Sequence, residues 1–405
     1  MNLSYASRVR GCLVGGAVGD ALGAPVEFAT DDEIRRRFPD GVRDFVASSP
    51  DGSVAVGRVT DDTQMTLFTI EGIIRAITRE LTRGLGFTNA VVHHAYLRWY
   101  DTQVLDGPPS ASTDDDRAGS LGWLGAQSWL YARRAPGNTC MSALQGGTAG
   151  IEGASIQFGE PARNDSKGCG GVMRSAPYGW LADGSNEKAI YELAVEAAGY
   201  THGHPTGQVA SGALALIIGS LMQGQSLDTA VKRTLTFLSR RKYAGETVAL
   251  LRRASDLAAQ PDAIADPAAA LRSLGAGWIA EEALAMGVFA AARYADVSQA
   301  IDALSLAVSH GGDSDSTGSI CGNILGALHG EGWVPASLAF QVEGRSTMLE
   351  LADDFVYLMG DRVTPTSALP MMLNAEGNQR LAGLTRAYDL HLLDSQAWFD
   401  RYPPG

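Results

Sequence analysis

The 405-residue sequence lacks several features that mark common protein classes. Its four cysteines are scattered without CxxC spacing, which argues against a disulfide framework and favours reduced thiols. Its longest apolar run, residues 209–222, is too short to cross a bilayer and is typical of a buried helix. The N-terminal residues form no long apolar stretch before Asp20, so no secretory signal is expected. We therefore expect a cytoplasmic protein without a membrane partner.

Basic charge is also scarce. The chain has 32 Lys and Arg against 45 Asp and Glu, which gives a net charge of −13. This balance argues against a nucleic-acid partner, because binding to phosphates needs a basic surface. Two explanations of the acidity stay open: solubility, or carboxylates gathered to bind cations. Charged residues make up only 19%, whereas 48 glycines are present, which indicates tightly packed elements joined by glycine-dependent turns.

Apolar residues recur at three- and four-residue spacings along most of the chain, which is the period of a helix. Strand-like alternation is confined to short pieces near residues 42–46 and 54–59. We predict an all-α protein, with one large helical domain over residues 1–363 and a C-terminal tail of unknown role over 364–405. The clearest expected helices span residues 63–79, 189–198, 209–222, 246–258, 280–294, 297–308 and 319–328.

Two acidic segments each precede an expected helix. Thr60, Asp61 and Asp62 come before the first helix, and Asp313 and Asp315 come before the last. Either segment alone is explained by N-capping, although one cap needs only one such residue. Together they offer four carboxylates and several hydroxyls, and four carboxylates brought together without cations would repel one another. If the segments meet, two hard divalent ions bound by oxygen are the natural counterpart, and Mg²⁺ or Mn²⁺ suits such ligands better than Zn²⁺.

Four further positions have both a functional and a structural interpretation. Glu27 ends a segment rich in small residues and is either a site carboxylate or a surface residue. The glycine-rich loop at 164–174 either cradles an anion with its backbone N–H groups or is a flexible connection. His202 either contacts a ligand or is structural. Trp278, in a Gly-Ala-Gly-Trp loop, either covers a planar ring or is buried. The chain has neither a GxxxxGK[ST] phosphate loop nor a GxSxG nucleophile motif.

The order of these segments resembles that of the ADP-ribosylglycohydrolase family, which includes dinitrogenase-reductase-activating glycohydrolase and the ADP-ribosylarginine hydrolases. The likeness runs from residue 11 to about residue 330 and does not cover the tail. The paired acidic segments are its most specific part. The matching segments are GCLVGGAVGDALGAPVEF, VTDDTQMTLFT, SKGCGGVMRSAP, THGHP, LGAGWIAEEAL and HGGDSDSTGSICGNILGALHG.

The resemblance implies an all-α orthogonal helical bundle with a binuclear Mg²⁺ or Mn²⁺ site at the base of a cleft. The implied metal ligands are Thr60, Asp61, Asp62, Asp313, Asp315 and Ser316. The implied ligand-binding residues are Gly168, Gly170, Gly171, Met173, Arg174 and His202. The candidate catalytic carboxylates are Glu27, Asp62 and Asp315, one of which would stabilise an oxocarbenium-like transition state or act as general base on a water.

The function expected from this resemblance is metal-dependent removal of ADP-ribose from a modified protein, with ADP-ribosylarginine as the substrate linkage and ADP-ribose as the product. An alternative within the same chemistry is an ADP-ribosylserine or other O-linked conjugate. An alternative of another class is a non-catalytic protein on this fold, either structural (as in a crystallin that resembles the family) or ADP-ribose-binding. A protein of this fold that had lost its catalytic activity would be expected to have lost acids from the two segments, and this sequence keeps all four.

Overall fold

The computed structural model describes residues 3–46, 57–109, 121–145, 159–260, 264–360 and 396–403. Within these ranges the structure contains helices and no strand, and an isolated bridge between Gly168 and Ile279 is the β-type pairing found there. The prediction of an all-α fold is therefore confirmed. Residues 42–46 form no strand, and the Val42 N–H donates to the Ser309 hydroxyl at 2.9 Å. Part of the 54–59 segment lies outside the described residues.

All seven helices expected from periodicity are present, most of them longer than expected. The elements in chain order are α1 (Tyr5–Gly23), η1 (Ala24–Val26), α2 (Asp31–Arg37), α3 (Asp61–Arg83), α4 (Ala90–Val104), α6 (Gly122–Gly125), η2 (Ser128–Leu130), α7 (Asn138–Leu144), η3 (Cys169–Gly171), α8 (Ala176–Trp180), α9 (Glu187–Gly199), α10 (Pro205–Met222), α11 (Leu227–Leu238), α12 (Gly245–Ala258), α13 (Pro267–Arg272), α14 (Ala280–Arg293), η5 (Val297–Gln299), α15 (Ala300–Val308), α16 (Ser314–His329), η6 (Glu331–Trp333), α17 (Ala336–Gln341), α18 (Arg345–Met359) and α20 (Gln396–Arg401).

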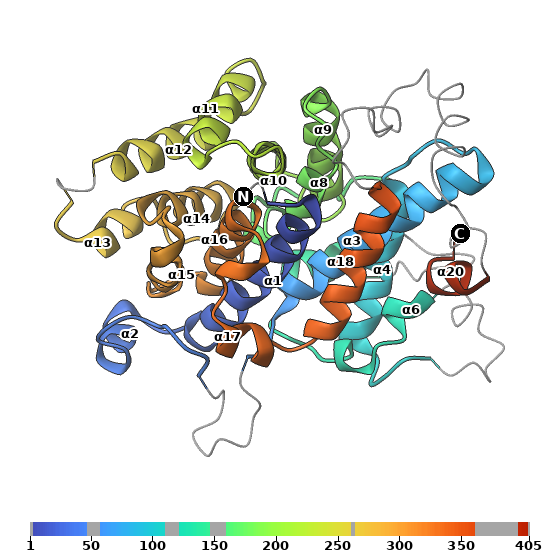
Figure 1. Ribbon diagram of the computed structural model, residues 1–405, viewed down its shortest axis with the longest axis horizontal. Coiled ribbons are helices and arrows are strands. Elements are labelled where there is room, and N and C mark those ends of the chain that lie inside the picture. The colour runs from blue at the N-terminus through green and yellow to red at the C-terminus, as the bar shows by residue number, and fades with distance from the viewer. Residues whose placement is uncertain are drawn as a thin grey trace.

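Helices α1 and α16 pack side by side near the centre of the molecule, with α11 to α13 on one side and α20 on the other (Figure 1). Glycines line this contact. A Cβ atom on Gly19 would lie 2.0 Å from the Gly318 carbonyl oxygen, and one on Gly322 would lie 2.0 Å from the Gly15 carbonyl oxygen. No side chain fits at these positions, so the two backbones touch directly. This contact brings the C-terminal end of α1 to the N-terminal end of α16, where two of the candidate site segments lie.

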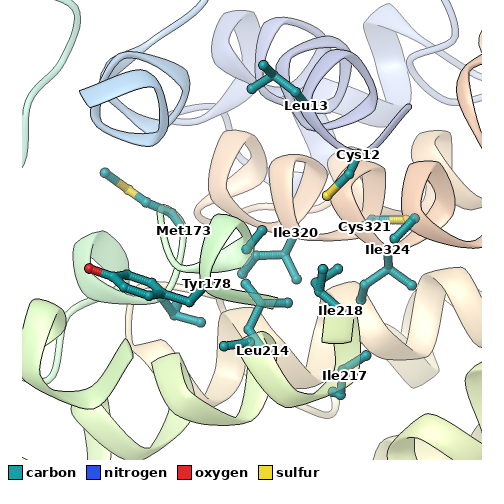
Figure 2. Packing of buried hydrophobic residues seen from close by; sticks show 14 of the residues in the cluster. Cys12, Leu13, Met173, Tyr178, Leu214, Ile217, Ile218, Ile320, Cys321 and Ile324 are labelled. Carbon is teal, nitrogen blue, oxygen red and sulfur yellow. The ribbon is translucent and has the colours of Figure 1, made fainter. Parts of the chain in front are cut away.

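Helix α10 packs against the other face of α16. Leu214, Ile217 and Ile218 of α10 lie with Ile320 and Ile324 of α16 in the buried core (Figure 2). Helix α10 is the one described helix that is long and apolar enough on its own to cross a membrane, and most of its residues are buried inside the protein. Burial on nearly all sides accounts for its uniformly apolar sequence.

The described end of the C-terminal tail packs against the helical domain. Trp398 is buried, its indole N–H donates to the Thr78 hydroxyl at 3.1 Å, and Tyr402 beside it is fully buried. The Tyr402 hydroxyl donates to the Asp354 carboxylate of α18 at 2.6 Å. The predicted tail thus returns to the domain at its end, while residues 361–395 lie outside the described part.

Candidate active site

The two acidic segments begin helices α3 and α16, and each also provides the helix cap. The Thr60 hydroxyl accepts from the Asp62 N–H at the start of α3, and the Asp313 carboxylate accepts from the Ser316 N–H at the start of α16. Capping and clustering are therefore not alternatives here. Thr60 caps α3 and Asp313 caps α16, and the acids of both segments still lie in one buried region.

Asp20 of α1 is a site residue that sequence reasoning did not single out. It is fully buried, and its carboxylate accepts hydrogen bonds from the Thr60 N–H at 3.0 Å, the Thr63 N–H at 3.1 Å and the Thr63 hydroxyl at 2.5 Å. These bonds fasten the N-terminus of α3 to α1. The sequence signal is a lone aspartate in an otherwise small and apolar stretch, which is an unusual residue for a helix buried on all sides.

The acids of α1, α3 and α16 and Glu27 share one buried region. Burial raises the pKa of each of these carboxyls, and the next cause for most of them is the negative charge of Asp315. The pKa of Asp315 is itself raised by burial. Asp315 is therefore the centre of a group of six carboxylates: Asp20, Glu27, Asp61, Asp62, Asp313 and Asp315. We call this group the acid cluster.

Five acids of the cluster line a cavity of about 200 Å³, and Asp20 lies outside that lining. Most of the predicted site residues line it: Glu27, Asp61, Asp62, Gly168, Gly170, Met173, His202, Asp313, Asp315 and Ser316. Thr60 and Gly171 lie behind the lining, where Thr60 caps α3 and Gly171 packs against Ala198 and Ser211. The structure thus brings together segments that are more than 250 residues apart in the sequence.

The donor chemistry of the acid cluster fits hard divalent cations. In the described part of the chain, no Lys, Arg or His forms an ion pair with any of the six carboxylates. The Asp62 Oδ1 atom is buried and has no hydrogen-bond partner among those residues. A buried carboxylate oxygen without a partner is costly unless a cation compensates it. All-oxygen ligands of this kind suit Mg²⁺ or Mn²⁺.

The acids are not arranged as a ready-made metal cage. Among the residues that the structure describes, no three His, Cys, Asp or Glu side chains stand together as ligands of one ion. Several of the carboxylate oxygens accept local hydrogen bonds instead: Asp61 from the Gly137 N–H at 3.4 Å and Asp313 from the Cys169 thiol at 2.7 Å. Metal binding would therefore require these side chains to exchange local donors for ions.

Two glycine-containing loops form the wall of the cavity. The Cys169 N–H donates to the Trp278 carbonyl at 3.2 Å, and the Asp313 N–H donates to the Ala276 carbonyl at 2.9 Å. Gly277, with φ +85°, allows the 275–279 loop to turn between these two contacts. Lys167 forms ion pairs with Glu246 and Glu281 behind the loop. The loop at 168–171 is thus held in place on both sides.

Arg174 does not take the predicted position. Its side chain is only 1% exposed and is absent from the cavity lining. Its guanidinium donates to the Ala197 carbonyl at 3.1 Å and to the Thr201 hydroxyl at 2.6 Å, and it stacks on the Tyr96 ring at 4.1 Å. The basic residue beside the glycine-rich loop therefore points into the core, and its predicted direct contact with a ligand does not fit this placement.

A pair of exposed aromatic rings lies beside Glu27. Phe28 is 76% exposed and Trp278 is 43% exposed, and their rings stack with centroids 6.0 Å apart. Trp278 also lines the cavity, so the pair stands at its rim. The alternative that Trp278 is buried is wrong, because nearly half of its surface is exposed.

A family model for ADP-ribosylglycohydrolases matches residues 1–365 of this chain. The chain belongs to the ADP-ribosylglycohydrolase family. A solved structure described as an ADP-ribosylglycohydrolase-related protein complex is similar in fold, with a TM-score of 0.51 and 24% identity, over 87% of this chain and 98% of that one. An uncharacterised protein of Archaeoglobus fulgidus is 41% identical over 70 residues, which span 17% of this chain and 22% of that protein's length.

Within this ADP-ribosylglycohydrolase-family site, sequence reasoning missed four lining residues from one segment. Ala135, Gly137, Thr139 and Cys140 lie around the start of α7. Ala135 has a positive φ of 51°, a backbone conformation that is uncommon for a residue with a Cβ atom. No sequence signal identifies Ala135, since glycine or asparagine would be the expected residue there.

Proposed function

We propose that this protein is a metal-dependent hydrolase that removes ADP-ribose from modified arginine side chains by cleaving the N-glycosidic bond. The observation that carries the proposal is the acid cluster: six buried carboxylates without a basic partner among the described residues, five of which line a cavity of about 200 Å³. Membership of the ADP-ribosylglycohydrolase family supplies the reaction class. A cytoplasmic location and the absence of nucleic-acid and membrane partners belong to the same proposal.

Six side chains would hold two Mg²⁺ or two Mn²⁺ ions: those of Thr60, Asp61, Asp62, Asp313, Asp315 and Ser316. When bound, such ions supply Lewis-acid polarisation of a water and of sugar hydroxyls. The orphaned Asp62 Oδ1 atom supports this assignment, because an ion would give that oxygen the partner it lacks.

The remaining steps belong to the side chains of the cavity. Breaking a glycosidic bond builds positive charge on the sugar ring, and a carboxylate of Glu27, Asp62 or Asp315 would stabilise that charge. The same three are the candidates for the general base that takes a proton from the attacking water. The backbone N–H group of Gly170, which lies in the wall, suits an oxygen of a diphosphate, whereas the Gly168 N–H donates to the Ser166 hydroxyl at 3.3 Å.

The exposed aromatic pair favours arginine over serine as the modified residue. A guanidinium binds well over an aromatic face, and the carboxylate of Glu27 beside Phe28 matches its positive charge. A seryl leaving group has neither the planar face nor the charge. Serine-linked or other O-linked ADP-ribose is therefore the second substrate. A non-catalytic binding or structural role is less well supported, since all four acids of the two segments are present.

Release of free ADP-ribose tests the proposal. Purified full-length protein with Mg²⁺ or Mn²⁺ is incubated with arginine-linked and serine-linked ADP-ribosylated peptides, and we expect release from the arginine linkage. Release from serine alone would overturn the linkage. Binding of ADP-ribose without release from either peptide would overturn the hydrolase assignment and favour the binding role.

A further inference from the structure

Arg174, Thr201 and His202 form a chain of hydrogen bonds from the core to the cavity wall. The Arg174 guanidinium donates to the Thr201 hydroxyl at 2.6 Å, and the Thr201 hydroxyl lies 2.9 Å from His202 Nδ1. All three residues are buried, and His202 lines the cavity. The chain therefore connects a residue that cannot reach a ligand to one that can.

The direction of these hydrogen bonds follows from the chemistry of the three groups. A guanidinium has only donors, so the Thr201 oxygen must accept from Arg174. The Thr201 proton then has to be donated elsewhere. The Ala198 carbonyl lies 3.5 Å away, at the limit of a hydrogen bond, whereas His202 Nδ1 lies at 2.9 Å. Nδ1 is therefore the better acceptor, and it accepts only when it carries no proton.

We propose that Arg174 and Thr201 are positioning residues that hold His202 as the neutral Nε2–H tautomer, with its single ring N–H directed to the cavity for an oxygen of the bound ligand. The tautomer part of this inference is independent of the proposed function. Its ligand part rests on that function, which supplies ADP-ribose as the molecule with suitable oxygens.

The surroundings of the ring agree with this assignment. A Cβ atom built on Gly168 would lie 3.3 Å from Nε2, and one built on Gly170 would lie 3.0 Å from the neighbouring Cε1, so only glycine leaves this side of the ring open. Nε2 makes no hydrogen bond within the described residues. Burial and then the charge of Arg174 lower the pKa of His202 to about 3, so the ring stays neutral. A neutral ring has one N–H, and its position decides whether the cavity contains a donor or an acceptor.

The tautomer is measured directly by nuclear magnetic resonance on the full-length, metal-free protein with isotope-labelled histidine. The shifts and couplings of the two ring nitrogens show which one carries the proton. We expect the wild-type protein and Thr201→Ser, which keeps the hydroxyl, to show a protonated Nε2 and a bare Nδ1. Thr201→Val removes the hydroxyl at nearly constant shape and should release the ring into a mixture of tautomers. A wild-type ring protonated at Nδ1, or a tautomer unchanged in Thr201→Val, would overturn the proposal.

Binding of ADP-ribose to the same proteins measures the consequence. We expect Thr201→Val to bind about tenfold more weakly and Thr201→Ser to bind as the wild type does, because one hydrogen bond to the ligand is lost or kept. The matched control is Thr234→Val, since Thr234 of α11 is equally buried and its hydroxyl has no hydrogen-bond partner among the described residues. Equal weakening in both Val variants would overturn the positioning role. If the wild type fails to bind ADP-ribose, the proposed function fails, and the tautomer spectra still decide the inference.

Discussion

Helix α3 carries two buried acidic sites that differ in how their charge is compensated. In its middle, fully buried Glu71 forms ion pairs with Arg75 and Arg98. At its N-terminus, Asp61 and Asp62 are nearly as buried but form no ion pair in the described part of the chain. The described residues thus provide two cations for the first site and none for the second. A buried charge that the protein compensates itself stabilises the fold, whereas one left uncompensated is suited to a ligand that brings the opposite charge.

The largest effect is expected from neutralising the uncompensated site. Asp62→Asn combined with Asp315→Asn should lower the rate of ADP-ribose release about a thousandfold or more and abolish Mn²⁺ binding, because two charged oxygen ligands are lost. Thermal unfolding of the metal-free protein should occur at the same or a higher temperature, since repulsion within the acid cluster is relieved.

Asp353→Asn is the control for this variant. Asp353 is an exposed aspartate of α18 whose charge is paired with Arg10, so both turnover and metal binding should be normal. Normal turnover by the Asp62/Asp315 double variant would contradict the interpretation of the cluster as a metal site.

The compensated site should show the opposite pattern. Glu71→Gln leaves Arg75 and Arg98 buried without a counter-charge and should lower the free energy of unfolding by about 3–5 kcal/mol. Denaturant unfolding measures this loss. Glu192→Gln is the matched control, since Glu192 is also paired at i,i+4, with Lys188, but on the surface, where such a pair contributes about 0.3–0.5 kcal/mol. Equal losses in the two variants would remove the distinction between buried and exposed pairs.

The sequence predicts which acids belong to the acid cluster better than it predicts that they lie close together in space. Runs such as Asp61-Asp62 before a helix contain more acids than an N-cap needs, and this surplus can be recognised from the sequence alone. Their approach to Asp315 depends on the glycine contact between α1 and α16, since a Cβ atom on Gly23 would lie 2.4 Å from the Asp315 nitrogen. Spacing along the chain contains no information about that contact. For Arg174, the family resemblance implied a contact with the ligand, but its guanidinium donates to the Ala197 carbonyl and the Thr201 hydroxyl in the core.

Glu80, near the C-terminal end of α3, offers an intermediate case, since it is a buried acid whose carboxylate accepts one backbone hydrogen bond, from the Phe87 N–H. It is 6% exposed, its Oε2 atom has no hydrogen-bond partner among the described residues, and burial raises its pKa from 4.5 to about 7. The folded state thus retains the proton that the unfolded state loses above pH 4.5. Glu80 therefore lowers stability by about 2–3 kcal/mol as the pH rises from 4.5 to 7.

Glu80→Gln should remove that part of the pH dependence. The variant should be about as stable as the wild type at pH 4.5 and more stable above pH 7, as measured by denaturant unfolding across the range, while Glu192→Gln follows the wild-type curve. If the free energy of unfolding depends on pH in the same way for Glu80→Gln and the wild type, water reaches this carboxylate. Burial alone would then not determine how the acids of α3 affect stability.

The smallest expected effect concerns the cation that the substrate itself brings to the uncompensated site. If a guanidinium lies over the Phe28–Trp278 pair, Trp278→Ala should raise KM for an arginine-linked substrate about tenfold and leave kcat nearly unchanged, since a cation–π contact contributes about 0.5–2 kcal/mol. KM for a serine-linked substrate should change less, because that leaving group has no charge. Phe340→Ala, which removes an exposed ring on α17, is the control. Equal increases in KM for both linkages would show that the rings bind the peptide and not its charge, and the acid cluster would then be compensated by metal ions alone.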